Sequence, residues 1–419
     1  MIDFYKKITI LSVGFHQKRA KEAGNMAILS EKDKQYLKKE DICTHLGDDY
    51  AKFMGAIVPP IFQNSLFVKP TPTNGVPDSG YVYTRVCNPT TEIAEKKIAA
   101  LEGADGALCF SSGMAAISSA ILHFVRDNCH VVYVASSYGP TRTFLTQYCA
   151  NRFGVTTTPV KGVTTEEVEA AIRPNTKLIY LESPSSGVFR LQDIEAISQI
   201  AKSKGIGTII DNTYATPLHQ NPLRYGIDIA VHTASKYMGG HSDIVAGALA
   251  ANAEIIESIQ HQERELLGSI MDPHQSWLLT RGLRTLPLRL KQHGANGRQV
   301  AQYLEQHPKV EQVFYPGSET FQQKELFQRY LSGTNGLISF VPKGTVEQVR
   351  QFMYDLKVFQ FGVGWGGFES LVINITVGYT PEQAEAVDCP VNLVRIHCGL
   401  EDADSLIADL EQAFEKLKV

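Results

Sequence analysis

Apolar and polar positions follow two different periods in the middle of the chain. Between residues 106 and 250, short apolar runs are separated by longer segments in which apolar residues recur every three or four positions. Short apolar runs are typical of buried strands, and the longer period is typical of helices with one buried face. The predicted strands are 106–110, 130–136, 177–183, 205–211 and 227–233, and clear helical segments are 164–174 and 193–205.

This alternation predicts an α/β fold. Strands that are joined through helices pair in parallel, so we expect a mostly parallel sheet with helices on both faces. In such sheets, ligands bind beyond the carboxyl ends of the strands. The residues directly after each apolar run are therefore the first candidates for chemistry.

The pattern changes after about residue 272. A long helical stretch, 272–308, is followed by apparent strands at 336–342, 370–377 and 392–399, which predicts a smaller α+β domain. The chain ends in a predicted helix with Asp404 as its N-cap. The apolar face of that helix would carry Leu406, Ile407, Leu410 and Phe414.

Composition and charge exclude several classes of protein. The net charge of −4 gives no reason to expect nucleic acid or an anionic membrane as partner. The apolar run at 8–15 is short for a signal peptide and no cleavage site follows it, so we expect a cytoplasmic protein. We expect the polar segment 16–41 to be helical or partly mobile. The seven cysteines lack C-x-x-C spacing, which argues against a disulfide framework or a zinc site.

Four of the predicted strands end in residues that can bind a ligand. Lys236 follows the strand 227–233 among small residues, and Asp211 ends the strand 205–211. Gly113 opens a helix whose free N–H groups suit an anion, and Tyr138 offers a ring for stacking. Taken alone, each has an ordinary explanation: a surface lysine, a turn aspartate, a helix cap and a partly buried ring.

Together, these four groups suit pyridoxal 5′-phosphate (PLP). Its phosphate needs hydrogen-bond donors, its ring needs a stacking partner, its ring nitrogen needs a carboxylate, and its aldehyde needs a lysine for a Schiff base. Nucleotide sites fit less well, because the glycines at 362, 364 and 367 precede a predicted strand instead of the helix that a dinucleotide site requires. The run His241-Ser242-Asp243 has no matching cluster elsewhere, so we expect no metal site.

Eight segments carry a resemblance to a known family. They are "YTRVCNPT", "SSGMAA", "LESPSS", "DNTYATP", "HTASKYMGGHSD", "TRGLRTLPLRL", "WGGFESL" and "VRIHCGLEDADSLIADL". From about residue 42 onward, the chain resembles the Cys/Met-metabolism family of PLP-dependent trans-sulfuration enzymes. The resemblance implies PLP fold type I, like aspartate aminotransferase. It also implies an extension and arm at 1–60, a large PLP-binding domain at 61–285 and a small domain at 286–419.

The resemblance also implies a role for each matching residue. Lys236 would form the Schiff base and act as the catalytic base, together with Tyr138, which would stack on the ring. Asp211 would pair with the ring nitrogen. The phosphate would be bound by Gly113, Met114, Thr233 and Ser235, and by Tyr83 and Arg85 of a neighbouring subunit. Family members are usually homotetramers built as a dimer of such dimers.

The substrate would be a small amino acid, bound by Arg395, Trp365, Ser186 and Gly364. Trp365, Ser186 and the segment 395–410 are most similar to bacterial cystathionine β-lyases. This favours β-elimination on cystathionine or cystine, which yields a thiol, pyruvate and ammonia. The segment 83–90 is closer to γ-enzymes, and Gly364 stands where serine is common.

Two alternatives stay open. The first is γ-elimination or γ-replacement, as in cystathionine or methionine γ-lyase, cystathionine γ-synthase or O-acylhomoserine sulfhydrylase. The second is a PLP-binding protein with little turnover.

Overall fold

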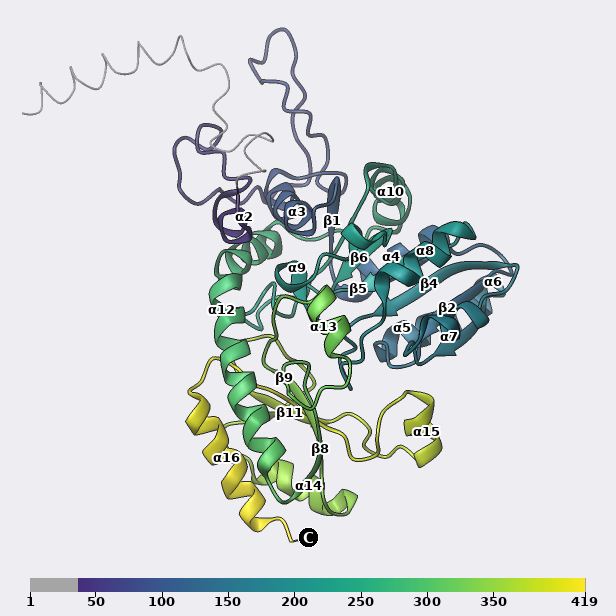
Figure 1. Cartoon of the computed structure of the whole chain (residues 1–419). Coiled ribbons are helices and arrows are strands. Elements are labelled where there is room, and N and C mark those ends of the chain that lie inside the picture. Colours follow the sequence, from purple (N-terminus) through teal and green to yellow (C-terminus); the bar gives the residue numbers. More distant parts are fainter. Residues whose placement is uncertain (1–36, 419) are drawn as a thin grey trace, which may run out of the picture.

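The computed structural model describes residues 37–418, which form two sheets joined by one long helix (Figure 1). The part of the polar segment that precedes residue 37 lies outside the described residues. The larger sheet has the strand order β1-β7-β6-β5-β4-β2-β3. Its strands are β1 Gly106–Phe110, β2 His130–Val134, β3 Thr156–Val160, β4 Thr176–Glu182, β5 Gly207–Asp211, β6 Ile229–His232 and β7 Gly247–Ala251.

Only β7 runs against its neighbours in this sheet, so the carboxyl ends of the other strands meet at one edge. The predicted α/β fold is therefore confirmed, as are the five predicted strands. Strands β3 and β7 were not predicted. The segment of β3 carries a proline and three threonines, and that of β7 consists of alanine, glycine and leucine, so neither has the β-branched apolar run typical of a buried strand.

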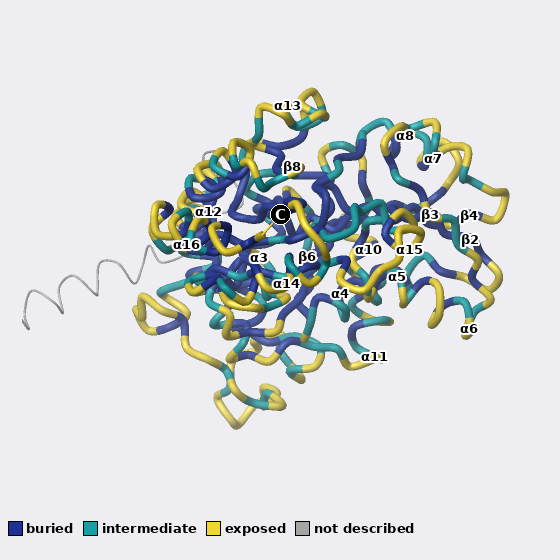
Figure 2. The backbone as a smooth tube through the Cα atoms, turned by 90° about the horizontal axis from the view of Figure 1, so that it is seen from below, coloured by how far each residue is buried: buried dark blue, intermediate teal, exposed yellow. Residues whose placement is uncertain are grey.

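Helices cover both faces of the sheet. On one face, α4 (Gly113–Phe124) packs its Ile117 and Ile121 against strands β4 to β7. On the other face lie α7 (Thr165–Ala170), α8 (Ile194–Ser203) and α3 (Pro89–Glu102). Buried residues concentrate along this sheet and its neighbour, whereas the outer loops are exposed (Figure 2).

The smaller sheet has the order β10-β11-β12-β9-β8. Its strands are β8 Val310–Phe314, β9 Leu337–Pro342, β10 Gln360–Phe361, β11 Leu371–Asn374 and β12 Val394–His397. Helix α12 (Pro273–Gln306) runs from the large sheet to this one and passes the expected domain boundary at 285. The strand predicted after the glycines at 362–367 is confirmed, since β11 lies within the predicted range 370–377.

The remaining helices are short, apart from α14 and α16. They are α2 Lys39–His45, α5 Gly139–Thr143, α6 Ala150–Phe153, α9 Thr216–His219, α10 Ala253–Ile259, α11 Glu265–Leu267, α13 Lys324–Tyr330, α14 Val346–Asp355, α15 Pro381–Ala386 and α16 Ala403–Lys416, with π-helical turns at Phe144–Cys149 and Gln260–Arg264 and a 3-10 turn at Pro222–Tyr225. Within residues 37–418, no helix is both long and apolar enough to cross a membrane.

The N-cap prediction for α16 was wrong by two residues. Asp402 is the cap, because its side chain accepts hydrogen bonds from the main-chain N–H groups of Asp404 and Ser405 at 3.1 and 3.2 Å. Asp404 already lies in the first turn. The predicted apolar face is correct, since Leu406, Leu410 and Phe414 are fully buried in the core of the small domain.

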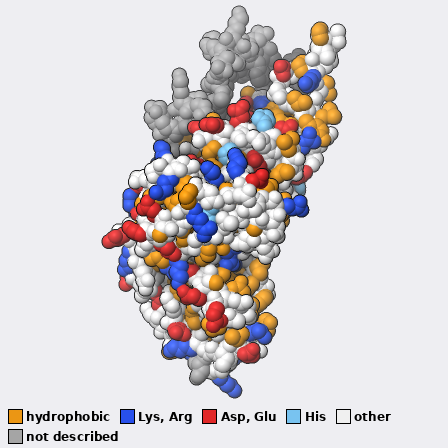
Figure 3. Space-filling model, turned by 90° about the vertical axis from the view of Figure 1, so that its right-hand side faces the viewer, with side chains coloured by type: hydrophobic (Ala, Val, Ile, Leu, Met, Phe, Trp, Pro, Cys, Tyr) orange, Lys and Arg blue, Asp and Glu red, His pale blue; other side chains and the backbone are white. Residues whose placement is uncertain are grey.

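The segment 56–87, called the arm here, projects from the body beside α3 (Figure 1). An antiparallel bridge between Leu66 and Tyr83 holds its two limbs together. Its apolar side chains are exposed, and hydrophobic side chains gather on the projecting end of the molecule (Figure 3). They include Ile57, Val58, Ile61, Leu66, Val68 and Val82.

Candidate active site

Lys236 lies in a tight turn between β6 and β7 whose main chain is fixed from both sides. Its N–H donates to Thr233 O at 3.1 Å, and Gly240 N–H donates to Lys236 O at 2.8 Å. From α12, the buried Arg289 donates to Tyr237 O at 2.7 Å. From the small domain, Gly366 approaches so closely that an added Cβ would lie 2.6 Å from the nitrogen of Tyr237.

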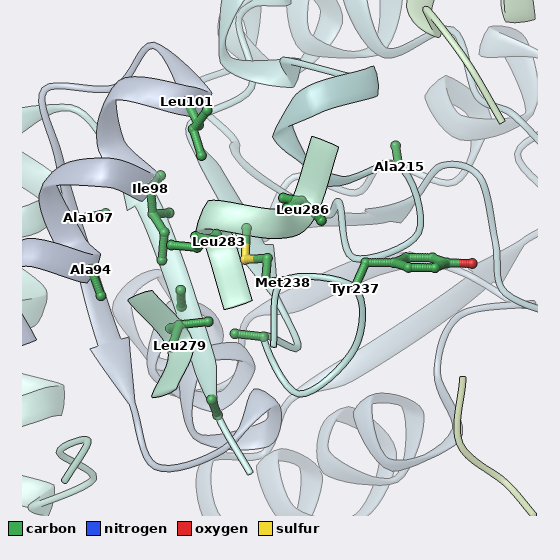
Figure 4. Close-up of a cluster of buried hydrophobic side chains, with 14 of the residues drawn as sticks. Ala94, Ile98, Leu101, Ala107, Ala215, Tyr237, Met238, Leu279, Leu283 and Leu286 are labelled. Atoms are coloured by element: carbon green, nitrogen blue, oxygen red, sulfur yellow. The ribbon is translucent and has the colours of Figure 1, made fainter. Parts of the chain in front are cut away.

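The residues after Lys236 anchor the turn in the core. Met238 and Tyr237 belong to the same buried cluster; Met238 lies beside Leu283 of α12, whereas the ring of Tyr237 points away from these two side chains (Figure 4). The Tyr237 ring packs near Trp365 at a centroid distance of 5.4 Å, and its hydroxyl accepts a hydrogen bond from Gly336 N at 3.2 Å. The lysine therefore stands on a rigid base.

The amine of Lys236 is partly buried, 5.5 Å from the centroid of the Trp365 ring. Burial lowers the pKa of Lys236 to about 8, with a further contribution from the Arg395 charge and partial opposition from Glu369. About a tenth of the amine is then neutral at pH 7, far more than for a lysine with the ordinary pKa of 10.5, and a proton-accepting lysine must be neutral.

Asp211 ends β5 and is buried. Its Oδ1 accepts two hydrogen bonds from Thr213, from the N–H at 3.0 Å and from the hydroxyl at 2.5 Å. Thr213 Oγ1 in turn accepts from the N–H of Thr233 at 2.8 Å, which ties Asp211 to the Lys236 turn. Burial raises the pKa of Asp211, and the bonds from Thr213 oppose that rise.

Gly113 and Thr233 meet at the N-terminus of α4. An added Cβ on Gly113 would lie 2.2 Å from Thr233 Oγ1, so this hydroxyl lies directly against the first turn of the helix. The Ser112 side chain caps the helix by accepting from Ala115 N. Ser235 is placed differently: its hydroxyl donates to Ala246 O at 3.2 Å and accepts from Ala246 N at 2.8 Å.

Tyr138 follows β2, and its ring is partly exposed. Burial raises the pKa of its hydroxyl, and the nearby carboxylates of Asp211 and Glu182 add to the rise. The hydroxyl therefore stays protonated at neutral pH. Its main-chain N–H donates to Glu182 Oε2 at 2.7 Å.

Arg395 reaches the same edge from β12. Its guanidinium donates to Ser186 O and to Val363 O, both at 3.1 Å. Gly364 and Trp365 follow Val363 directly in the chain. The other predicted substrate residues, Ser186, Gly364 and Trp365, therefore all lie on the two segments that Arg395 contacts. A guanidinium in this position can bind a carboxylate with two parallel hydrogen bonds.

Tyr83 and Arg85 lie elsewhere, on the arm. The Arg85 guanidinium stacks 4.9 Å from the centroid of the Tyr83 ring, and both residues line a cavity of about 580 Å³. Neither Lys236 nor Asp211 lines that cavity. Within one described chain, these two predicted phosphate ligands are therefore not brought together with the others.

Comparison with known proteins identifies the family of this chain. The family model for Cys/Met metabolism PLP-dependent enzymes matches residues 40–415. The chain is 40% identical to an L-methionine gamma-lyase of Porphyromonas gingivalis, over 87% of this chain and 94% of that one. It is 37% identical to a cystathionine gamma-lyase of Bacillus subtilis, over 91% of this chain and all of that one.

A solved structure, that of metB from Corynebacterium glutamicum, superposes with a TM-score of 0.86 at 33% identity and covers 92% of this chain and all of that one. Fold and site thus define a PLP-dependent enzyme of fold type I. The chain belongs to the Cys/Met metabolism family, and PLP is its cofactor.

The free hydrogen-bonding groups of the site fit PLP. Among the described residues, no acceptor pairs with the N–H of Gly113 or Met114, and no donor pairs with Oδ2 of Asp211. Two free amides and the Thr233 hydroxyl at a helix N-terminus suit a phosphate. A carboxylate oxygen without a donor, on an aspartate that is otherwise buried, suits a protonated ring nitrogen.

Four residues that support the site were not predicted. Thr213 and Glu182 hold Asp211 and Tyr138, while Arg289 and Gly366 fix the Lys236 turn. Glu182 could have been found, because it ends β4 as Asp211 ends β5. Arg289 and Gly366 come from distant segments, and nothing in the local sequence indicates their contacts.

Proposed function

We propose that this protein is a PLP-dependent carbon–sulfur lyase that acts by γ-elimination on methionine or cystathionine. The observation that carries the lyase chemistry is the partly buried Lys236, whose pKa is lowered by burial and by the Arg395 charge and whose turn is tied through Thr213 to Asp211. The choice of γ-elimination is supported by the relatives, since seven bacterial proteins that are 36–40% identical are named as methionine or cystathionine gamma-lyases.

The residues divide the work as follows. When bound, PLP supplies an electron sink for the charge that develops on the substrate carbon chain. Arg395 binds the α-carboxylate, Asp211 pairs with the ring nitrogen, and Tyr138 packs on the ring. The amine of Lys236 would accept the proton from Cα and pass it on to the cofactor; neutral again, it would remove a second proton from Cβ, which γ-elimination requires. Tyr138, which stays protonated at neutral pH, can donate a proton to the departing thiolate.

We further propose that the arm completes the site of a neighbouring copy. Tyr83 and Arg85 would bind the phosphate there, and the assembly would be a homotetramer built from two such dimers. Two observations support this arrangement: the apolar side chains of the arm are exposed, and Tyr83 and Arg85 line a cavity that neither Lys236 nor Asp211 lines.

β-Elimination on cystathionine is the second candidate. It is favoured by Trp365, which is mostly buried and lies 5.5 Å from the Lys236 amine, and which is shared with bacterial cystathionine β-lyases in the resemblance described above.

A substrate panel of methionine, cystathionine, cystine and O-acyl homoserines, with identification of the keto acid, tests the proposal. We expect 2-oxobutyrate from methionine or cystathionine, whereas pyruvate from cystathionine would establish β-elimination instead. Lys236→Ala should lower turnover at least ~10³-fold, because base and Schiff base are lost together. Turnover by this variant at near the wild-type rate would refute the mechanism. An enzyme that binds PLP but acts on none of these amino acids would point to a binding protein.

A further inference from the structure

Glu182 is a buried carboxylate that the chemistry above does not use. It is the last residue of β4, paired in register with Asp211, and only 4% of it is exposed. Both of its oxygens accept main-chain hydrogen bonds from different loops. Oε2 accepts from Tyr138 N at 2.7 Å, and Oε1 accepts from Ser186 N at 2.9 Å.

Glu182 thus bridges the main chains of Tyr138 and Ser186. Ser186 in turn contacts Arg395, the residue proposed to bind the substrate carboxylate. Ser186 O accepts a hydrogen bond from Arg395 Nη1 at 3.1 Å, and the other guanidinium nitrogen donates to Val363 O at 3.1 Å. A continuous series of hydrogen bonds thus joins Tyr138, Glu182, Ser186 and Arg395. Two of these are the residues proposed to hold the ring and the substrate carboxylate.

We propose that Glu182 is a positioning residue that sets the Tyr138 loop and, through Ser186, the guanidinium of Arg395 in one fixed relation. The inference rests on the proposed function of Tyr138 and Arg395. Only an ionised carboxylate satisfies both N–H donors. A glutamine would turn its own NH₂ group toward one of them, and the buried donor would lose its acceptor.

The charges around Glu182 make this bridge sensitive to pH. Burial raises the pKa of Glu182 to about 7, and the Asp211 carboxylate on β5 adds to the rise. The other titratable groups that face it are Arg395 from β12 and the Tyr138 and Tyr180 hydroxyls. Below this pKa, one oxygen becomes a hydroxyl, which is a much weaker acceptor for the N–H that it faces. The bridge should therefore weaken as the pH falls through about 7.

Two substitutions test the charge of Glu182 and the position of its oxygens one at a time. Glu182→Gln keeps the size and removes the charge, whereas Glu182→Asp keeps the charge and withdraws the oxygens by one methylene. We expect both to raise KM about tenfold with kcat changed much less, because the carboxylate-binding arginine loses its fixed place. Glu167→Gln is the matched control, since both Glu167 oxygens also accept main-chain N–H groups, those of Lys161 and Gly162, beside the edge strand β3. Its KM should equal that of the wild type.

A double-mutant cycle with Arg395→Lys shows whether the effect passes through the arginine. Glu182→Gln should add little to the KM of Arg395→Lys, because residues in one hydrogen-bond network are not additive. Full multiplication of the two effects, or a wild-type KM for Glu182→Asp, would overturn the proposal.

Binding of glycine to the PLP-loaded protein, followed by cofactor absorbance, provides a measurement without turnover. It separates failure of this inference from failure of the proposed function. If Glu182→Gln does not fold, the wild-type affinity for glycine decides: an affinity that is constant between pH 6 and pH 8 contradicts the bridge, once the known ionisation of glycine is corrected for.

Discussion

The edge of the large sheet around Lys236 and the arm each contain a glycine with positive φ and large apolar side chains. At the edge these residues are closely packed, whereas on the arm they are exposed. At the edge, Gly366 has a positive φ of 83° and leaves no room for a Cβ. On the arm, Gly80 has a φ of 75°, and nothing lies within 4 Å of where its Cβ would be. At the edge, Trp365 is 9% exposed, while Leu66 on the arm is 59% exposed.

This difference shows which parts of the site a single chain completes. Around Lys236, the contacts that support the turn come from the same chain: from the segment after β5, from α12 and from the small domain. The arm carries a stacked Arg85–Tyr83 pair and several apolar side chains that no other described residue covers. Apolar surface of this kind is typical of an interface. Four experiments test whether the Lys236 edge is supported within one chain and whether the arm serves a second one.

The largest expected effect is complementation between two inactive variants. Arg85→Ala and Lys236→Ala should each lose most activity. In a mixed dimer, one site combines the intact lysine of one chain with the intact arginine of the other. After dissociation and reassociation at equal amounts, half of the dimers are mixed, so activity should return to about a quarter of the wild-type value. Mixtures that remain as inactive as their components would show that the arm does not serve a second chain.

Replacement of Gly366 and of Gly80 by alanine should distinguish the cost of a crowded Cβ from the cost of a positive φ. Gly366→Ala forces a Cβ against the main chain of Lys236 and Tyr237 in addition to the unfavourable φ, and should cost roughly 3 kcal/mol of unfolding free energy. Gly80→Ala meets only the unfavourable φ and should cost about 1 kcal/mol. Urea unfolding measures both. Equal costs would mean that the approach of Gly366 to the lysine turn is looser than 2.6 Å implies.

Replacement of Lys236 by Met should stabilise the cofactor-free protein in a pH-dependent way. Because the folded protein holds the pKa of Lys236 at about 8 against an ordinary value of 10.5, the charged form is penalised on folding. The penalty is full below pH 8 and disappears as the pH rises to 10.5. Lys236→Met should therefore gain about 1–3 kcal/mol at pH 7 and much less at pH 10.

Chemical unfolding at both pH values checks this prediction. Lys69→Met, at an exposed position on the arm, is the control and should stay within about 0.5 kcal/mol of the wild type. A gain for Lys236→Met that is the same at both pH values would contradict the assignment of the gain to the buried charge.

The smallest effect on folding is expected from the apolar side chains of the arm. Leu66→Ser and Val68→Ser should change the unfolding free energy of the single chain by less than about 0.5 kcal/mol, because both positions are already exposed. They should nevertheless weaken self-association, which sedimentation at decreasing concentration measures. If assembly is unchanged, the arm does not lie at the interface.

Much of the site could be predicted because of one topological rule. Lys236, Asp211 and Tyr138 each follow an apolar run, and parallel strands bring such positions to one edge. The same rule applies to Glu182, which ends β4 in register with Asp211, although no role was predicted for it. The position of Ser235 shows what the rule leaves out, since its hydroxyl bonds to the main chain of Ala246, which directly precedes the unpredicted strand β7.

By itself, the sequence determined the strands with β-branched runs, the order of the two sheets along the chain and the residues at the strand ends. These depend on local periodicity, which is written in neighbouring residues. Only the tertiary structure decided that Arg289 and Gly366 contact the Lys236 turn and that Arg395 contacts Ser186 and Val363. It also decided that Arg85 lines a cavity that Lys236 does not line. Those arrangements depend on the packing of segments more than 50 residues apart in the chain, as the distance from Tyr237 to Arg289 illustrates, and no local pattern records them.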